Sequence, residues 1–134
     1  MSRMHTQRVQ TAGFTVVELI VVSMIVIIMA SVAIPNYIQS VERGREREAL
    51  AVLNAIIAGQ EVYSAERGAN IALNSDAAWI AIGVDNPNLN ANRSFNYTYD
   101  PGSGVATATR RSGGNQNETI TVAPGGIQGG SWSL

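Results

Sequence analysis

The chain has 134 residues, which suits one modest domain, and its nine basic residues, all arginines, nearly balance ten acidic ones. With a net charge of −1 and no concentrated basic face, no nucleic-acid partner is expected. The chain has no cysteine, which excludes disulfides, thiolate nucleophiles and cysteine metal sites, and its only histidine is His5.

A long apolar run follows a short basic tail. It extends over 21 residues, from Phe14 to Ile34, and Glu18 is its only charge. As a helix rising 1.5 Å per residue the run is about 30 Å long, the thickness of a bilayer's hydrocarbon core. Valine and isoleucine favour strands in water, but a lone strand in lipid leaves its backbone unpaired. The run therefore predicts a membrane-spanning helix over 14–34.

Three interpretations of this run compete. A signal peptide cut after Ala33 fits the small residues of "SVA", but such apolar regions are typically about 7–15 residues long and uncharged. An ordinary anchor fits the length if Glu18, near the helix end, snorkels to the interface. Cleavage between Gly13 and Phe14 instead puts a new amino terminus one turn from Glu18, where the helix dipole favours a carboxylate. A buried carboxylate needs a cationic partner, and a neighbouring subunit's amino terminus is one.

The stretch "GFTVVELIVVSMIVIIMASVAIPNY" closely resembles the start of type IV prepilins and of the pseudopilins of type II secretion. The resemblance covers residues 1–13 as a leader and extends more loosely to about Arg67. It is carried by the apolar run together with Gly13, Phe14, Thr15, Glu18, Leu19, Pro35, Asn36 and Tyr37.

The resemblance implies how the chain is processed and assembled. A membrane prepilin peptidase removes residues 1–13 on the cytoplasmic side and N-methylates Phe14, and Glu18 then pairs with the amino terminus of an adjacent subunit. Arginines flank the span on both sides, so the cytoplasmic placement of the leader rests on the resemblance and not on charge. The subunit is then expected as a single-pass inner-membrane protein before assembly and as a periplasmic or cell-surface filament afterwards. Pilus or secretion assembly machinery is an implied partner.

The helix is predicted to continue past the span to about Arg67, where Gly68 stops it. Pro35 removes a backbone donor and favours a kink, and Gly44 is a second weak point at which the helix can melt during assembly. Apolar residues at three- and four-residue steps from Leu50 to Tyr63 predict an amphipathic half that faces a core. The charge cluster 42–48, with Glu42–Arg45 as one opposite pair, is interpreted as a solvated face.

The remaining chain is polar and reads as short elements. The stretch 75–83 predicts a short helix with Ser75 or Asp76 as its cap and Gly83 as its end. The loop 85–92 has oxygen ligands like the calcium loops of some pseudopilins. However, Asp85 is its only carboxylate and EF-hand spacing is missing, so Asx turns are the favoured interpretation.

The C-terminal third predicts an antiparallel sheet. "SFNYTYDPGSGVATATR" alternates as a hairpin, 118–126 adds a strand, and "SWSL" is expected as a short edge. The predicted fold class is α+β. It comprises a leader over 1–13, a spanning helix over 14–34, and a pilin-like domain over 35–134 in which the amphipathic half of a long kinked helix packs on the sheet.

The predicted function is structural: the processed chain polymerises into a type IV pilus or a type II secretion pseudopilus. Beyond residue 13 there is no His or Cys, which excludes Ser-His and Cys-His pairs and histidine metal sites, so neither enzyme, cofactor nor metal is expected. The alternative is a secreted or membrane-anchored binding protein with residues 1–33 as mere export signal or anchor. Many pilins close a C-terminal loop with a disulfide, which this chain cannot form; this favours a pseudopilin or a cysteine-free pilin.

Overall fold

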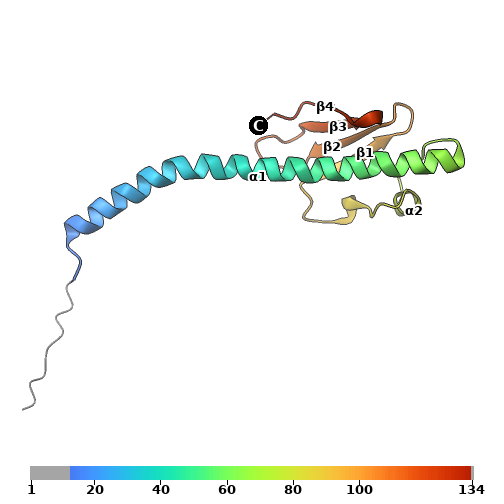
Figure 1. Ribbon diagram of the computed structural model, residues 1–134. Coiled ribbons are helices and arrows are strands. Elements are labelled where there is room, and N and C mark those ends of the chain that lie inside the picture. Colours follow the sequence, from blue (N-terminus) through green and yellow to red (C-terminus); the bar gives the residue numbers. More distant parts are fainter. Residues whose placement is uncertain (1–12, 134) are drawn as a thin grey trace, which may run out of the picture. The chain divides into compact units, whose positions relative to one another are not determined.

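The computed structural model describes residues 13–133, so the predicted leader lies outside the described residues except for Gly13 (Figure 1). The chain is α+β, as predicted: one long helix and a small antiparallel sheet in a pilin-like arrangement. The elements in order are α1 (Val16–Arg67), α2 (Asp76–Ala81), η1 (Pro87–Leu89), β1 (Phe95–Asp100), β2 (Val105–Arg110), β3 (Thr119–Ala123), η2 (Pro124–Gly126) and β4 (Ile127–Gly130).

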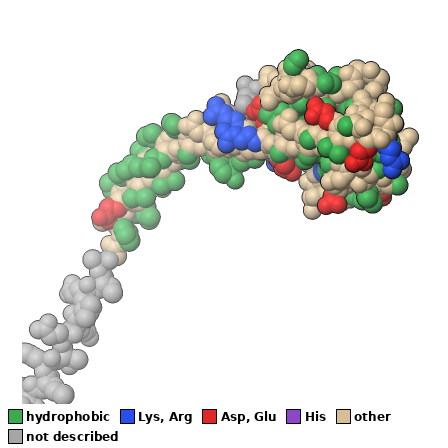
Figure 2. All heavy atoms as spheres, turned by 45° about the vertical axis from the view of Figure 1, so that its right-hand side comes forward, with side chains coloured by type: hydrophobic (Ala, Val, Ile, Leu, Met, Phe, Trp, Pro, Cys, Tyr) green, Lys and Arg blue, Asp and Glu red, His purple; other side chains and the backbone are tan. Residues whose placement is uncertain are grey.

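Packing divides the chain into two units, one ending at Ile38 and the other beginning at Gln39. In the first unit, large hydrophobic side chains are exposed on every side of α1. Many of them are visible in green along the face of the helix that Figure 2 shows. Within residues 13–133, α1 is the helix that is long and apolar enough to cross a membrane, and none of its most apolar window is buried. A helix that is apolar all round requires either lipid or other apolar helices as its surroundings.

The helix α1 runs without interruption through Pro35 and Gly44, so the expected continuous helix is confirmed. Pro35 has no N–H to donate to the carbonyl of Ser31, so one backbone hydrogen bond of the helix is missing. The helix α1 ends at Arg67, and Gly68 follows with a φ of +79°, the left-handed conformation that favours glycine at a helix end.

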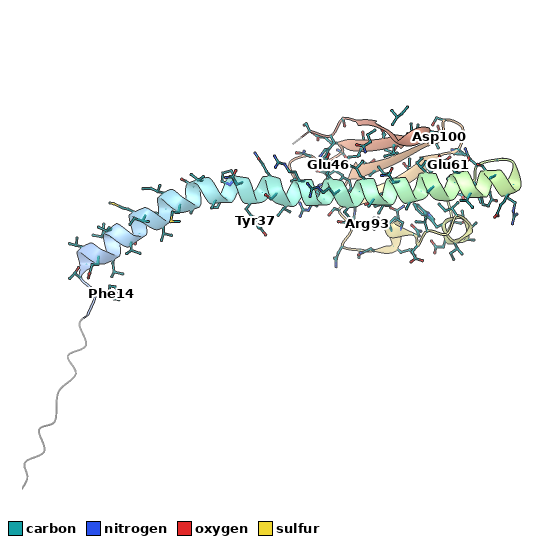
Figure 3. The ribbon with its side chains drawn as sticks, viewed as in Figure 1. Phe14, Tyr37, Glu46, Glu61, Arg93 and Asp100 are labelled. Carbon is teal, nitrogen blue, oxygen red and sulfur yellow. The ribbon has the colours of Figure 1, made fainter. Side chains whose placement is uncertain are left out.

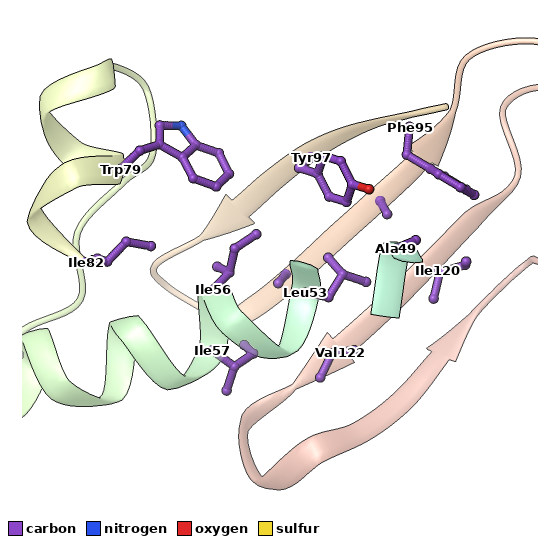
Figure 4. Packing of buried hydrophobic residues seen from close by; sticks show 12 residues of the cluster. Ala49, Leu53, Ile56, Ile57, Trp79, Ile82, Phe95, Tyr97, Ile120 and Val122 are labelled. Carbon is purple, nitrogen blue, oxygen red and sulfur yellow. The ribbon is translucent and has the colours of Figure 1, made fainter. Parts of the chain in front are cut away.

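The second unit is built around the amphipathic half of α1, whose buried side was predicted from Leu50 to Tyr63. Leu53, Ile56 and Ile57 are buried there, while Leu50 and Tyr63 are half-buried against the same core. Figure 4 shows this side of α1 packed against the sheet and against Trp79 of α2. Neither layer has another apolar surface to cover it in this unit, so each stabilises the other.

The sheet order in the described chain is β1-β2-β3-β4, with every neighbouring pair antiparallel. Side chains alternate between buried and more exposed along β2 and β3, which puts Ala106, Ala108, Ile120 and Val122 against α1. The two alanines lie in β2, one of the two inner strands, where their small size lets the helix approach closely. On β1, burial raises the pKa of Tyr97 to about 12, with the carboxylate of Glu48 adding to the shift.

Two amide side chains fix loops that lack regular pairing. Gln60 is only 2% exposed, and its amide both donates to the carbonyl of Ile71 (2.7 Å) and accepts from its N–H (3.0 Å). Asn88 does the same to Tyr97, at 2.8 and 2.9 Å. Each amide therefore bonds to the N–H and the carbonyl of one residue in another segment, as a neighbouring strand would. The amide of Asn88 does this on the outer edge of β1.

The short elements agree with their predicted signals. Ser75 caps α2 by accepting from the N–H of Ala78, and Gly83, with a φ of +72°, follows its end. In the 85–92 loop, the side chains of Asn86 and Asn90 accept from the backbone two residues further on, so the predicted Asx turns are present.

The predicted edge strand at "SWSL" is wrong, because the edge strand is β4, Ile127–Gly130. Gly125 and Gly126 both have positive φ and reverse the chain immediately after Pro124, so the very next residues pair with β3. The segment 131–133 lies beyond this strand as a tail. It is held by a bond from the N–H of Trp132 to the carbonyl of Thr119.

The interpretation of residues 42–48 as a solvated face holds for Arg43, Arg47 and Glu48, which are exposed, but it is wrong for Glu42. Glu42 forms the predicted ion pair with Arg45, but it also accepts from Arg110 of β2 at 3.2 Å. Arg110 is 5% exposed and lies over the ring of Phe95. The first turns of α1 in the second unit are thus tied to the sheet by a largely buried charge pair.

Removing the first unit is expected to leave a soluble, monomeric domain, because the uncovered apolar surface goes while the core stays intact. The sequence suggests deletion of residues 1–41. A fragment that starts at Gln39 is better, since it keeps helix ahead of Glu42. Size-exclusion chromatography with far-ultraviolet circular dichroism tests this. An aggregated or unfolded fragment would contradict the packing of α1 on the sheet as a self-sufficient core.

Candidate processing and assembly site

The predicted cleavage junction lies just before α1. Gly13, Phe14 and Thr15 have no regular secondary structure, and the helix begins at Val16 (Figure 3). Phe14 is 82% exposed, and a Cβ added to Gly13 would meet nothing within 4 Å. The junction is therefore accessible and non-helical, as a peptide bond must be to enter a protease site.

Glu18 and Thr15 form a capping box at the start of α1. The N–H of Thr15 donates to Oε2 of Glu18 at 2.8 Å, and the Thr15 hydroxyl donates to the same oxygen at 3.0 Å. In return the N–H of Glu18 donates to the Thr15 hydroxyl at 3.2 Å. These bonds satisfy backbone donors that the first turn of a helix otherwise leaves free.

Sequence reasoning assigned Glu18 a charge and missed this cap, although its signal, "TVVE", was readable as Ser/Thr-x-x-Glu. The box uses the N–H of Thr15, which lies beyond the predicted cleavage after Gly13, so it is compatible with a processed chain. Each carboxylate bond of the box uses Oε2. The ion pairs formed among residues 13–133 involve Glu42 and not Glu18.

The predicted site residues fall into two groups along α1. Gly13, Phe14 and Glu18 lie together at the helix start, whereas Pro35 and Gly44 lie well inside it. Around Pro35, side chains bond to helix carbonyls: Ser31 donates to that of Ile28 and Asn36 to that of Val32. The described residues contain no cluster of three or more His, Cys, Asp or Glu that would hold a metal ion.

An exposed apolar helix that begins with a Thr15–Glu18 capping box and continues into a half packed on a small antiparallel sheet defines a pilin-like protein. Comparison with known proteins agrees with this class. The chain is 33% identical over 78 residues to the type IV wide pilus major component PilA4 of Thermus thermophilus, which covers 58% of each chain. It is 38% identical over 55 residues to the type IV major pilin protein PilA of Myxococcus xanthus, covering 41% of this chain and 25% of that one.

The chain thus spans 58% of the first of these relatives and a quarter of the second. No family model matches it, and no solved structure does either. The predicted resemblance to type IV pilins is confirmed by both relatives, whose names describe pilus components.

Proposed function

We propose that this chain is a structural subunit of a type IV pilus, cut after Gly13, N-methylated on Phe14 and polymerised through α1. The observation that carries the proposal is the part of α1 in the first unit, which is apolar all round and uncovered, yet has a charged glutamate in its first turn. Such a helix is suited to a membrane before assembly and to a bundle of identical helices afterwards. The names of both relatives favour a pilus over a secretion pseudopilus.

In the assembled state, each α1 is surrounded by copies of itself. One head-to-tail contact repeated without closure builds an open helical fibre, with the second units outside. A carboxylate inside such a bundle needs a cation, and the methylated amine of a neighbouring Phe14 is the one that processing supplies. The prepilin peptidase and the assembly machinery are the partners that this route requires.

Processing is the first test. We expect a mature chain that starts at N-methylated Phe14. It has 121 residues, which is the full length of 134 less the 13 of the leader. Gly13→Leu is expected to block cleavage. It leaves the fold unchanged, because no atom lies within 4 Å of the added Cβ. Intact mass of the membrane-bound subunit reports both outcomes.

Gly44→Leu is the matched control for Gly13→Leu, since a Cβ there also meets nothing within 4 Å. The control should be processed normally. Filaments whose subunits still carry residues 1–13 would disprove this route, and a mature chain that starts at Ile34 would support the secreted binding protein instead.

A second test concerns the segment between the two units. In the filament we expect the helix between Ile34 and Gly44 to lose hydrogen bonds and extend, because Pro35 has already removed one at its beginning and Gly44 weakens the helix at its end. Glu42 is paired with Arg110, so the extended part should end before it, within 34–41. Cryo-electron microscopy of sheared filaments decides this, and unbroken helical density from Phe14 to Gly44 would refute it.

A further inference from the structure

One face of α1 in the second unit is covered neither by the sheet nor by α2. Its residues recur at alternating steps of three and four over three heptads, and every one of them is exposed. We call this the open face; it consists of Gly44, Arg47, Ala51, Asn54, Ala58, Glu61 and Ala65. A seven-residue repeat is the pattern by which one helix packs along another, and small side chains on it let two backbones come close.

The open face carries one positive and one negative charge, separated along its length. Arg47 lies near its beginning, and Glu61, labelled in Figure 3, lies near its end. Both occupy the same heptad line and are 14 residues apart, about 21 Å along the axis at 1.5 Å per residue. Neither forms an ion pair within residues 13–133, where the ion pairs are those of Glu42.

These charges select the partner and its register. Two parallel copies in register place Arg47 against Arg47 and Glu61 against Glu61, which is repulsive. A shift of one heptad places each charge against Asn54. A shift of two heptads places Arg47 of one copy against Glu61 of the next and keeps the small residues face to face, with Ala51 opposite Ala65.

We propose that the open face docks the open face of a second copy of this chain, parallel and shifted by 14 residues, with an Arg47–Glu61 ion pair between copies. The parallel direction rests on the proposed function, because subunits that leave one membrane point the same way. Since each copy uses the beginning of its face for one neighbour and the end for another, the contact does not close and extends along a fibre.

Charge reversal tests the ion pair in the full-length chain. Arg47→Glu should lower the yield of sheared filaments by at least about tenfold, because it opposes two carboxylates across the contact. Adding Glu61→Arg should restore the yield to within about threefold, as expected for a direct pair. Asp85 is exposed and off this face, so Arg47→Glu with Asp85→Arg has the same net charge and should not restore it.

Cysteine cross-linking tests the register, and the chain has no native cysteine to interfere. With Ala51→Cys and Ala65→Cys in one chain, the two thiols are about 21 Å apart and cannot join within a copy. Mild oxidation of filaments should therefore give a ladder of covalent multimers. Ala51→Cys with Asp85→Cys is the matched control and should give none.

Two results would overturn the proposal. One is normal filaments with no ladder from the 51/65 pair. The other is a covalent dimer from Asn54→Cys alone, because residue 54 faces itself in antiparallel helices or in parallel helices that are in register, but not in parallel helices shifted by 14 residues. If the unaltered chain, correctly processed, forms no filaments, the proposed function fails together with the docking face; if filaments form but do not cross-link, only the docking face fails.

Discussion

Replacing Glu18 with alanine is expected to lower filament yield by at least about tenfold, because truncating one partner of a desolvated charge pair weakens the contact by that much or more. Cleavage after Gly13 should be unaffected, since the apolar helix inserts in the membrane at least as well without the charge. Immunoblots of sheared filaments and of membrane-bound subunit measure the yield, and intact mass confirms processing.

The capping box makes the alanine variant ambiguous, because it removes both a charge and a cap. Two further variants separate these roles. Glu18→Gln keeps an oxygen that can accept from Thr15 but removes the charge. Thr15→Ala removes the hydroxyl that bonds to Glu18 but leaves the carboxylate and the backbone N–H in place.

If Glu18 acts by charge, Glu18→Gln should fail to assemble as Glu18→Ala does, while Thr15→Ala should assemble at close to the normal yield. The reverse pattern, with Glu18→Gln active and Thr15→Ala inactive, would assign Glu18 to helix initiation alone. Normal yield from the alanine variant would leave the glutamate as a snorkelling side chain with no part in assembly.

The helices were predictable because their signals are local. The run from Phe14, the stripe from Leu50 to Tyr63, and the glycines that follow α1 and α2 each depend on neighbours within a few residues. The same holds for the hairpin, whose alternation puts Phe95, Tyr97 and Tyr99 on one face; in the structure the first two are buried and Tyr99 is half-buried. Each of these elements is confirmed because one periodicity dominates its segment.

The features that sequence reasoning missed depend on distant partners. Glu42 and Arg110 are 68 positions apart, and nothing in either segment indicates that they meet. Gln60 and Asn88 look like ordinary polar residues until Ile71 and Tyr97 are placed beside them. The edge strand was misplaced because a turn of two positive-φ glycines at Gly125 and Gly126 has no apolar pattern around it. Tertiary pairing, not local propensity, decides these positions.

The ion pair between Glu42 and Arg110 has unequal partners. Arg110 is nearly fully buried against Phe95, and Glu42 is the acidic side chain that compensates its charge. Glu42 retains 22% exposure of its side chain and a second cation, Arg45. Removing the Glu42 carboxylate therefore leaves the buried charge of Arg110 without a partner. Removing Arg110 instead leaves Glu42 paired with Arg45 and partly hydrated.

This asymmetry gives the second large prediction, on the stability of the fragment that starts at Gln39. Glu42→Gln is expected to lower its free energy of unfolding by about 3 kcal/mol or more, in the range for breaking a buried pair. Arg110→Met, which keeps an apolar chain over Phe95, should cost clearly less. The double variant should be more stable than Glu42→Gln alone, because no buried charge is then left without a partner. Urea unfolding measures all three, with Arg43→Met as an exposed-arginine control. If the two single effects instead proved equal and additive, Glu42 and Arg110 would be energetically independent. The ion pair would then not explain why the extended segment of the filament ends at residue 41.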